Sequence, residues 1–310
     1  MIALGGNALA PSGAESTIAA QFRHTRESLQ PVVDLALDGW GVCLVHGNGP
    51  QVGDELLRNE VARELAAPLP LGVLVAATAG WIGYMIQQSL ENALARAGSA
   101  RRVATLITQV LVDPDDPALA EPSKFIGHEV VAERAAALAA AGDQLRRDGR
   151  GRLRRVVASP RPQAIHDLPA VRALLAQDII VVCCGGGGVP VYVDAARGLE
   201  GMDVVVDKDL AAAVLAHELG AELLLILTDV DAVYVEWGTP RARPLPRLSV
   251  AEAERLEAAG AFGAGSMAPK VHAATDFVRR GGGRAIITEL SRGREAVRGE
   301  AGTTITAERS

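Results

Sequence analysis

The sequence has 310 residues, of which 49% are hydrophobic and 22% are charged, and its formal net charge is −6 at pH 7. This length accommodates one large α/β domain or two smaller ones, and the negative charge argues against a nucleic-acid-binding protein. No apolar run reaches the roughly 18 residues of a membrane-spanning helix, no signal peptide is recognisable, and Cys43, Cys183 and Cys184 lie in apolar segments, so we expect a cytoplasmic protein with no membrane partner.

The chain opens with two units in which an apolar strand runs into a glycine turn. The first four residues form a predicted strand that ends in Gly5-Gly6-Asn7, and a helix is expected over residues 16–38. Residues 42–45 form the second strand and run into His46-Gly47-Asn48-Gly49. In a parallel sheet both turns would meet at the carboxyl edge, where α/β proteins bind ligands. Plain turns are the alternative, and the histidine is either an acid or base or a structural residue.

The middle of the chain predicts a long helix and then an excursion from the sheet. Residues 71–97 are apolar on nearly every helical face, so we expect other helices or a second subunit to cover them. A third strand follows at residues 103–107. Prolines then interrupt the pattern, and residues 112–158 predict a protruding flap with a helix over 129–145 and a basic hairpin that is solvated or contacts nucleic acid. Lys124 lies in this flap, either over a site or simply on the surface.

The last part of the chain predicts the remaining strands of the sheet. Residues 179–184 are continuously apolar, as in a central parallel strand, and end in four glycines. Asp229 and Asp231 follow a later strand and either bind a metal or make turn hydrogen bonds. The other strands are expected at residues 222–227, 285–287 and 303–305, and helices at about 168–177, 249–259 and 269–280.

Two lysines are expected at helix N-termini. Asp207, Lys208 and Asp209 open an alanine-rich helix, and Lys270 follows Pro269, a residue that suits the first helical turn. A helix N-terminus favours anions through its free N–H groups and its dipole, and a lysine there adds a mobile cation for a phosphate. Asp209 could hold a lysine in place; alternatively, Asp207 or Asp209 only caps the helix.

Several segments together resemble the carbamate kinases, a branch of the amino acid kinase family. The matching segments follow one another from the first residues to Gly302-Thr303-Thr304, so they cover essentially the whole chain. They are Ala3–Leu9, His46–Gly53, Gly80–Met85, Asp207–Asp209 and Gly265–Lys270.

The resemblance implies an α/β fold, a three-layer αβα sandwich with a mainly parallel central sheet. It implies one domain over residues 1–310, with the flap at 112–158 inserted within it, and a homodimer. The implied activity is that of an ATP-dependent phosphotransferase of arginine metabolism, which moves a phosphoryl group reversibly between ATP and carbamate. Mg²⁺ would lie on the phosphates of ATP or ADP, and no metal site of the protein's own is expected.

The resemblance also implies roles for individual residues. Lys208 and Lys270 would neutralise the phosphates, Asp209 would orient these lysines, and Lys124 would reach in from the flap. Because carbamate is already anionic, no general base is required, and the reaction needs mainly positioning and positive charge. The carbamate and the transferred phosphoryl group would lie against Gly5, Gly6, Asn7, Gly47, Asn48 and Gly49, and the nucleotide near Asp229, Tyr234, Ser266 and Met267.

Three positions depart from the family pattern. Phe125 stands where the flap motif usually has proline, which loosens the backbone and weakens the prediction for Lys124. Ala268 replaces a glycine next to the nucleotide, and Ala79 stands where glutamine is common. Two alternatives remain: a related kinase for another small carboxylate or phosphate acceptor, and a weakly active binding or regulatory protein on the same fold.

Overall fold

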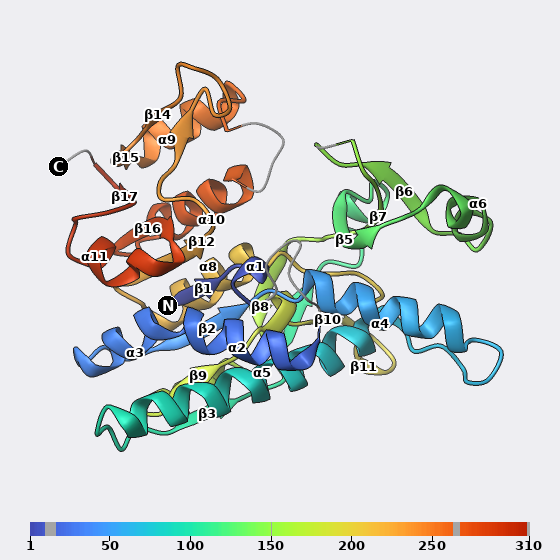
Figure 1. The fold of residues 1–310 in the computed structure, drawn as a ribbon, viewed down its shortest axis with the longest axis horizontal. Coiled ribbons are helices and arrows are strands. Elements are labelled where there is room, and N and C mark those ends of the chain that lie inside the picture. The colour runs from blue at the N-terminus through green and yellow to red at the C-terminus, as the bar shows by residue number, and fades with distance from the viewer. Residues whose placement is uncertain (10–16, 150, 263–266, 309–310) are drawn as a thin grey trace.

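The computed structural model describes residues 1–9, 17–149, 151–262 and 267–308, and its centre is an eight-stranded sheet (Figure 1). The strand β16 pairs antiparallel with β17 and the other neighbouring strands pair in parallel, which confirms the predicted mainly parallel sheet. In spatial order the strands are β15 (Arg247–Ser249), β17 (Thr303–Thr306), β16 (Arg284–Glu289), β12 (Leu223–Thr228), β1 (Ile2–Leu4), β2 (Cys43–His46), β9 (Ile180–Val182) and β3 (Val103–Thr105).

Helices cover both faces of this sheet, and the alternation of side chains along each strand explains why. Ala3 and Val45 belong to one buried cluster, whereas Leu4 and Leu44 belong to another. Because successive strand residues point to opposite faces, a strand that is apolar throughout has to be covered twice. The first face is covered by α7 (Leu168–Leu175), α8 (Lys208–Leu219), α9 (Val250–Ala258) and α10 (Met267–Arg279), and the second by α2 (Ile18–Ser28), α3 (Gln30–Leu37), α5 (Leu71–Arg96) and α11 (Gly293–Val297). The three-layer αβα sandwich is therefore confirmed.

Two predicted helices are shorter than the apolar spacing indicated. The helix expected over residues 16–38 is divided into α2 and α3 at Leu29, with Pro31 in the first turn of α3. Proline has no N–H to continue the hydrogen bonds of a preceding helix, so the chain starts a new one. The helix expected over 129–145 is α6 (Ala132–Ala140); it ends before Gly142, whose φ of 94° does not fit a right-handed helix.

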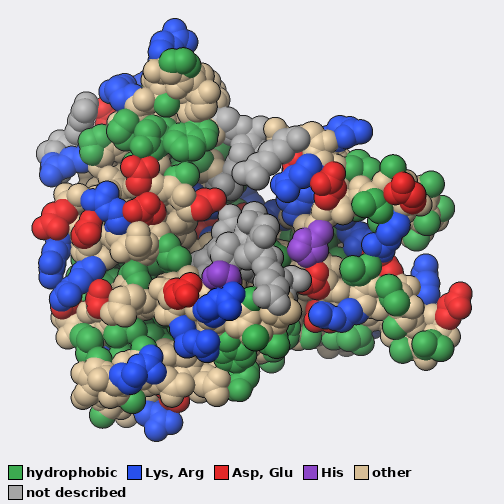
Figure 2. Space-filling model, viewed as in Figure 1, with side chains coloured by type: hydrophobic (Ala, Val, Ile, Leu, Met, Phe, Trp, Pro, Cys, Tyr) green, Lys and Arg blue, Asp and Glu red, His purple; other side chains and the backbone are tan. Residues whose placement is uncertain are grey.

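The flap extends from the body of the molecule beside α4 (Gly49–Ala62) (Figure 1). It contains α6 and a three-stranded antiparallel sheet of β5 (Lys124–Glu129), β7 (Leu153–Val157) and β6 (Gln144–Arg147). The basic run lies in the β6–β7 hairpin, where Arg152 pairs with Asp148 and Arg155 pairs with Glu60 and Asp143. On the face shown in Figure 2, Lys and Arg are interspersed with Asp and Glu over both the body and the flap.

The remaining elements connect these parts. Four of the remaining strands form a second sheet in the order β11, β10, β4 and β8, and β13 and β14 form a separate pair. Among the helices that the structure describes, none combines the length and the apolar character needed to cross a membrane. The remaining elements that connect the body and the flap are α1 (Gly6–Leu9), β4 (Gln109–Val112), β8 (Pro162–Ile165), β10 (Val189–Asp194), β11 (Gly198–Gly201), β13 (Tyr234–Val235), β14 (Arg243–Pro244) and the short 3₁₀ turns η1 (Pro117–Leu119), η2 (Gly185–Gly187) and η3 (Leu290–Arg292).

Candidate active site

A cavity of about 320 Å³ opens at the carboxyl edge of the central sheet and is bounded on one side by the flap. Three lysines line it, and each comes from a different element: Lys124 from β5, Lys208 from α8 and Lys270 from α10. We call this space the flap cavity. It also brings together the predicted residues Gly5, Gly6, Gly47, Asn48, Gly49 and Asp229.

The two lysines of the body share one carboxylate. The Nζ atom of Lys208 forms an ion pair with Oδ1 of Asp209, and Nζ of Lys270 lies 3.4 Å from Oδ2 of the same side chain. Burial lowers the pKa of Lys208, and the charge of Asp209 opposes that shift. Two ammonium groups thus lie side by side with one negative charge between them, an arrangement that favours a further anion.

Asp207 performs a different task from Asp209, so both predicted uses of an aspartate occur here. Its Oδ1 atom caps α8 by accepting hydrogen bonds from the backbone N–H groups of Asp209 and Leu210, at 2.8 and 3.3 Å. Its Oδ2 atom pairs with the ammonium group of Lys124. Burial by itself would raise the pKa of Asp207, but the charges of Lys124 and Lys208 outweigh it and hold that pKa well below its ordinary value. The flap lysine is therefore tied to the same helix end that carries Lys208.

The glycine turns pack against one another with no room for side chains. A Cβ atom added to Gly47 would lie 3.1 Å from the backbone nitrogen of Gly6 and 3.3 Å from Cδ of Lys208. A Cβ atom on Gly186, in the turn after β9, would lie only 2.3 Å from the side-chain nitrogen of Asn48. The predicted turns after β1, β2 and β9 therefore meet at one place, and their glycines are required by this close approach.

Hydrogen bonds of the Asn48 and His46 side chains fix the turn after β2. Asn48 is buried, and its amide donates a hydrogen bond of 2.9 Å to Oγ1 of Thr78 on α5. Burial lowers the pKa of His46 to about 4, so the ring is neutral near pH 7 and its Nδ1–H donates to the carbonyl oxygen of Gly47 at 3.0 Å. His46 is not among the residues that line the flap cavity, which favours the structural interpretation over an acid or base.

Three helices begin at the flap cavity. They are α4, α8 and α10, whose first turns place Gly49, Lys208 and Lys270 in its wall. The first N–H groups of a helix have no partner within the helix, and the helix dipole gives that end a partial positive charge. At α8 the N–H groups of Asp209 and Leu210 already donate to Asp207, so Lys208 is the group that this helix end offers to an anion. Together with the lysines, the starts of α4 and α10 are suited to a phosphate-like anion.

The residues expected near the nucleotide are less completely gathered. Asp229, directly after β12, lies in the wall of the flap cavity. Tyr234 on β13 points its hydroxyl at Asp231, to which it donates at 3.0 Å, and its ring packs against Trp237 with centroids 4.9 Å apart. Neither Tyr234 nor Met267 lines the flap cavity. Ser266 and the side chain of Asn7 lie outside the described residues.

Reading the sequence missed part of the flap cavity wall. Phe125 contributes from the flap, and its ring lies 5.6 Å from the guanidinium carbon of Arg154. Phe125 remains in the β5 ladder opposite Val156, and the pairing stays in register from Lys124 to Ile126 without the usual proline, although it shifts after Ile126. Lys124 accordingly lies at the cavity despite this departure. The apolar wall residues Val205, Leu227 and Leu290 could not have been singled out, because they resemble any buried residue in their segments.

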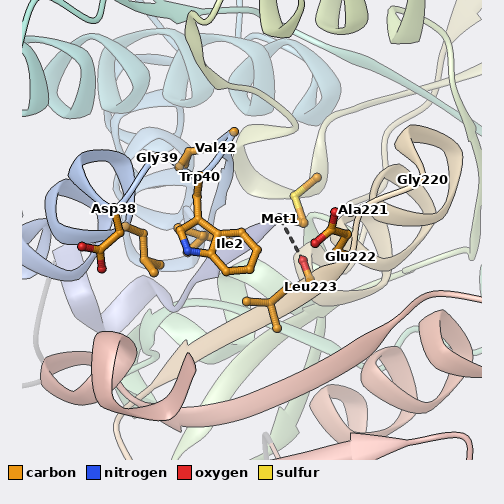
Figure 3. A pocket seen from close by; sticks show the side chains of 12 residues that line it. Met1, Ile2, Asp38, Gly39, Trp40, Val42, Gly220, Ala221, Glu222 and Leu223 are labelled. Atoms are coloured by element: carbon orange, nitrogen blue, oxygen red, sulfur yellow. Dashed lines mark hydrogen bonds between the residues drawn. The ribbon is translucent and has the colours of Figure 1, made fainter. Parts of the chain in front are cut away.

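A second, larger cavity of about 620 Å³ lies at the opposite, amino edge of the sheet (Figure 3). Its charged side chains are the carboxylates of Asp38 and Glu222, which lie on opposite sides of the Trp40 indole in this view. The amino group of Met1 donates to the carbonyl oxygen of Leu223 at 2.8 Å. Asp38 is paired with Arg294, and the described residues that line this cavity include no lysine or arginine that could bind a phosphate, so the smaller flap cavity is the better candidate. Among the residues that the structure describes, no group of three or more His, Cys, Asp or Glu side chains could hold a metal ion.

Comparison with known proteins shows which proteins this chain resembles. The model of the amino acid kinase family matches residues 1–289. A carbamate kinase of Escherichia coli O6:H1 is 45% identical, and the match covers 98% of this chain and 98% of that protein. Among solved structures, carbamate kinase from Giardia lamblia bound to citric acid superposes with a TM-score of 0.93, and the same enzyme bound to AMP-PNP with a TM-score of 0.90. Both are 36% identical and cover 98% of this chain and 97% of their own.

Proposed function

The chain belongs to the amino acid kinase family, and from this premise we propose that it catalyses reversible phosphoryl transfer between ATP and carbamate. The observation that carries the proposal is the placing of Lys208 and Lys270 on one buried carboxylate, beside the packed glycine turns of the flap cavity. The carbamate kinases found among its relatives support carbamate as the acceptor.

In this reaction a carbamate oxygen forms the new bond to the γ-phosphorus while the bond to the ADP oxygen breaks. Carbamate would rest against the turns at Gly5-Gly6 and Gly47–Gly49, which lie in the wall of the flap cavity. The backbone N–H groups of Gly5 and Gly47 already donate to the carbonyl oxygens of Leu227 and Leu4, so we assign the contact with carbamate to the other groups of these turns. Lys208 and Lys270 would contact the oxygens of the migrating group, where negative charge is spread during transfer. The attacking oxygen is already anionic, so the site needs no base.

Asp209 acts in this proposal as a positioning residue. Its two oxygens fix the separation of the two ammonium groups, and its charge supports the charged form of Lys208 against burial. The two ammonium groups held on Asp209 would meet the negative charge of the phosphate oxygens.

The nucleotide would occupy the side of the flap cavity next to Asp229, toward Tyr234, Ser266 and Met267. AMP-PNP, an ATP analogue, is bound by the similar Giardia lamblia enzyme. Mg²⁺ would be carried by the nucleotide phosphates. The described wall fits that arrangement, because it offers the single carboxylate of Asp229 and such an ion needs only one or two protein carboxylates beside phosphates and water. When bound, the ion would neutralise charge on the β- and γ-phosphates.

We propose further that the chain works as a homodimer through the exposed face of α5. Val73 and Tyr84 are exposed on this helix, and Ile107 is exposed beside it. The neighbouring strand β3 is at the edge of the central sheet. Exposed apolar side chains next to an open sheet edge are typical of an interface. Light scattering of a Tyr84→Arg variant is expected to show monomers, and an unchanged mass would exclude this face.

Two further proposals concern organisation. Residues 1–310 would form one domain into which the flap, residues 112–158, is inserted, and limited proteolysis would then cut the flap before the body. We also propose a cytoplasmic location, in which Cys43, Cys183 and Cys184 would remain the buried free thiols that the structure contains.

The activity is tested by measuring ATP formation from carbamoyl phosphate and MgADP, with acetyl phosphate and N-acetylglutamyl phosphate as competing donors. We expect carbamoyl phosphate to give the highest kcat/KM by about tenfold or more. The N-acetylglutamyl group is much larger than the carbamoyl group, and acetyl phosphate has a methyl group where carbamoyl phosphate has an NH₂ group that can form hydrogen bonds. A higher value for another donor would identify a related kinase instead. Nucleotide binding without turnover of any donor would indicate a binding or regulatory protein.

A further inference from the structure

The flap rests on the body through a contact between two glycines. Gly53 lies on α4 and Gly127 lies on β5. A Cβ atom built on Gly53 would come within 2.0 Å of Cα and 2.7 Å of the nitrogen of Gly127, distances that no real side chain tolerates. The backbones of helix and flap strand therefore touch directly, and Gly127 has a φ of 66°, which glycine adopts most readily.

Polar interactions surround this glycine contact and connect the same two elements. His128 lies 2.8 Å from Asp54, and Arg134 and Arg155 of the flap both pair with Glu60 of α4. Within the flap, Arg154 donates a hydrogen bond of 2.7 Å to the carbonyl oxygen of Gly127. The position of β5 on α4 is thus defined by a close backbone contact at its centre and by ion pairs at its margin.

This contact is coupled to the flap cavity through one strand. Lys124 precedes Gly127 by three residues on β5, at most about 10 Å along the strand. The pairing of β5 with β7 is in register from Lys124 to Ile126 and shifts between Ile126 and Glu129, so Gly127 lies at the start of the irregular part of the strand. Its ammonium group reaches across the cavity to Asp207 at the start of α8. A hydrogen bond weakens steeply once its distance grows by a few tenths of an ångström. Lifting β5 off α4 by about the thickness of a methyl group would therefore withdraw Lys124 from its partner.

We propose that Gly53 is a positioning residue for phosphoryl transfer. Because Gly53 has no side chain, β5 packs directly on α4, and this short distance between the two backbones brings Lys124 into the active site. This inference rests on the proposed function and adds a residue that touches neither substrate nor nucleotide. It also accounts for glycine at positions 53 and 127, which are far apart in the sequence, because a side chain at either position would crowd the backbone of the other.

Local helix stability does not explain a glycine at this position. Glycine in a helix interior is less favourable than alanine by about 0.8–1 kcal/mol. Alanine at position 53 would therefore strengthen α4, were it not for the backbone of Gly127. The contact with the flap is the cost that opposes this gain.

The test compares Gly53→Ala with Lys124→Ala and with the double variant in ATP formation from carbamoyl phosphate and MgADP. We expect Gly53→Ala to lower kcat/KM by about tenfold, similar to Lys124→Ala. The double variant is expected to have the same kcat/KM as Lys124→Ala alone, because both changes remove the same contribution, that of the Lys124 ammonium group in the active site. Gly41→Ala is the matched control, since nothing lies within 4 Å of its added Cβ atom; its kcat/KM is expected to stay within about twofold of the parent.

Two results would overturn the inference: an undiminished kcat/KM for Gly53→Ala or for Lys124→Ala, or losses that multiply in the double variant. Where Gly53→Ala does not fold, Glu60→Gln replaces it, because this change removes the carboxylate shared by Arg134 and Arg155 and is expected to act in the same direction.

Hydrogen exchange separates this inference from the proposed activity. We expect the amides of β5 and β7 to exchange about tenfold faster in Gly53→Ala than in the parent or in Gly41→Ala, whatever the substrate. If Gly53→Ala exchanges faster than the parent but the parent forms no ATP from carbamoyl phosphate, the inference about the flap is upheld and the proposed reaction is refuted. Unchanged exchange together with a loss of activity would refute the seating alone.

Discussion

The body and the flap hold their lysines in different ways. Lys208 and Lys270 have side chains only 12% and 9% exposed, and both meet the buried carboxylate of Asp209. Lys124 is 39% exposed, and it meets Asp207 across the flap cavity from a strand that projects away from the sheet. The body lysines belong to the same rigid helix ends as the rest of the phosphate site, whereas Lys124 depends on where the flap lies.

This difference predicts a division of labour. Buried charges that are fixed before the substrate arrives stabilise a transition state without any cost of rearrangement. A partly exposed charge is screened by water and gains strength only when the cavity closes around a ligand. We therefore expect the body lysines to govern turnover and the flap lysine to govern how well the closed complex forms.

The largest effect is expected for Lys270→Ala. This change removes one of two fixed ammonium groups at the migrating phosphoryl group, and turnover should fall by about 100-fold or more, the scale for losing one charge stabiliser. Steady-state ATP formation at saturating carbamoyl phosphate measures it. Turnover close to that of the parent protein would show that Lys270 does not take part in the mechanism. It would also show that the body lysines do not govern turnover more strongly than Lys124 does.

Asp209→Asn is expected to cost less turnover, about 10- to 50-fold, since both lysines remain. Its sharper signature is the pH profile. Burial and Lys270 lower the pKa of Lys208, and Asp209 opposes them, so loss of the carboxylate lowers that pKa further. Lys208 then loses its proton at lower pH, and the alkaline limb of kcat/KM moves toward neutrality. A limb that stays in place would show that Asp209 does not support the charge of Lys208.

Lys124→Ala is expected to reduce kcat/KM by about tenfold, with more of the change in KM than in kcat, because Lys124 is partly exposed and acts through closure. Lys124→Gln, which keeps the length of the side chain but not its charge, serves as the comparison and should resemble alanine. A loss as large as that of Lys270→Ala would show that the flap charge is as fixed in its function as those of the body.

The sequence was most informative where local pattern and chemistry coincide. The apolar runs at residues 1–4 and 179–184 predicted parallel strands, and the glycines behind them predicted turns at one sheet edge. Lys208 and Lys270 were recognisable because each follows a helix-start signal. Such features lie within a few residues of one another, so they can be read without the fold.

Contacts between distant segments were not readable. Nothing in the sequence near Lys124 indicates that Asp207 is its partner, and nothing near Gly53 indicates Gly127. Phe125 was expected to weaken the position of Lys124, yet both residues stay paired with β7 and Arg154 covers the ring. The neutral state of His46 also depends on burial by segments far from it. These features arise only when the flap and the turns are brought together.

His46 gives the smallest expected effect and tests the rigidity of the body. Burial lowers its pKa from 6.5 to about 4 in the folded protein. As pH falls below 6.5, the unfolded chain takes up a proton that the folded protein refuses, so the free energy of unfolding decreases as the pH is lowered toward 4.

Between pH 7 and pH 5.5 this loss amounts to about 1 kcal/mol. Urea unfolding of the parent and of His46→Asn, whose amide can still donate to Gly47, measures it at the two pH values. Carboxylates such as Asp207, whose pKa is held low, lose stability only at more acidic pH and leave this window clear. We expect His46→Asn to lose about 1 kcal/mol less than the parent over this range. Equal losses in both proteins would mean that His46 takes up a proton in the fold, and that the support beneath the turn at Gly47 is open to water rather than rigid.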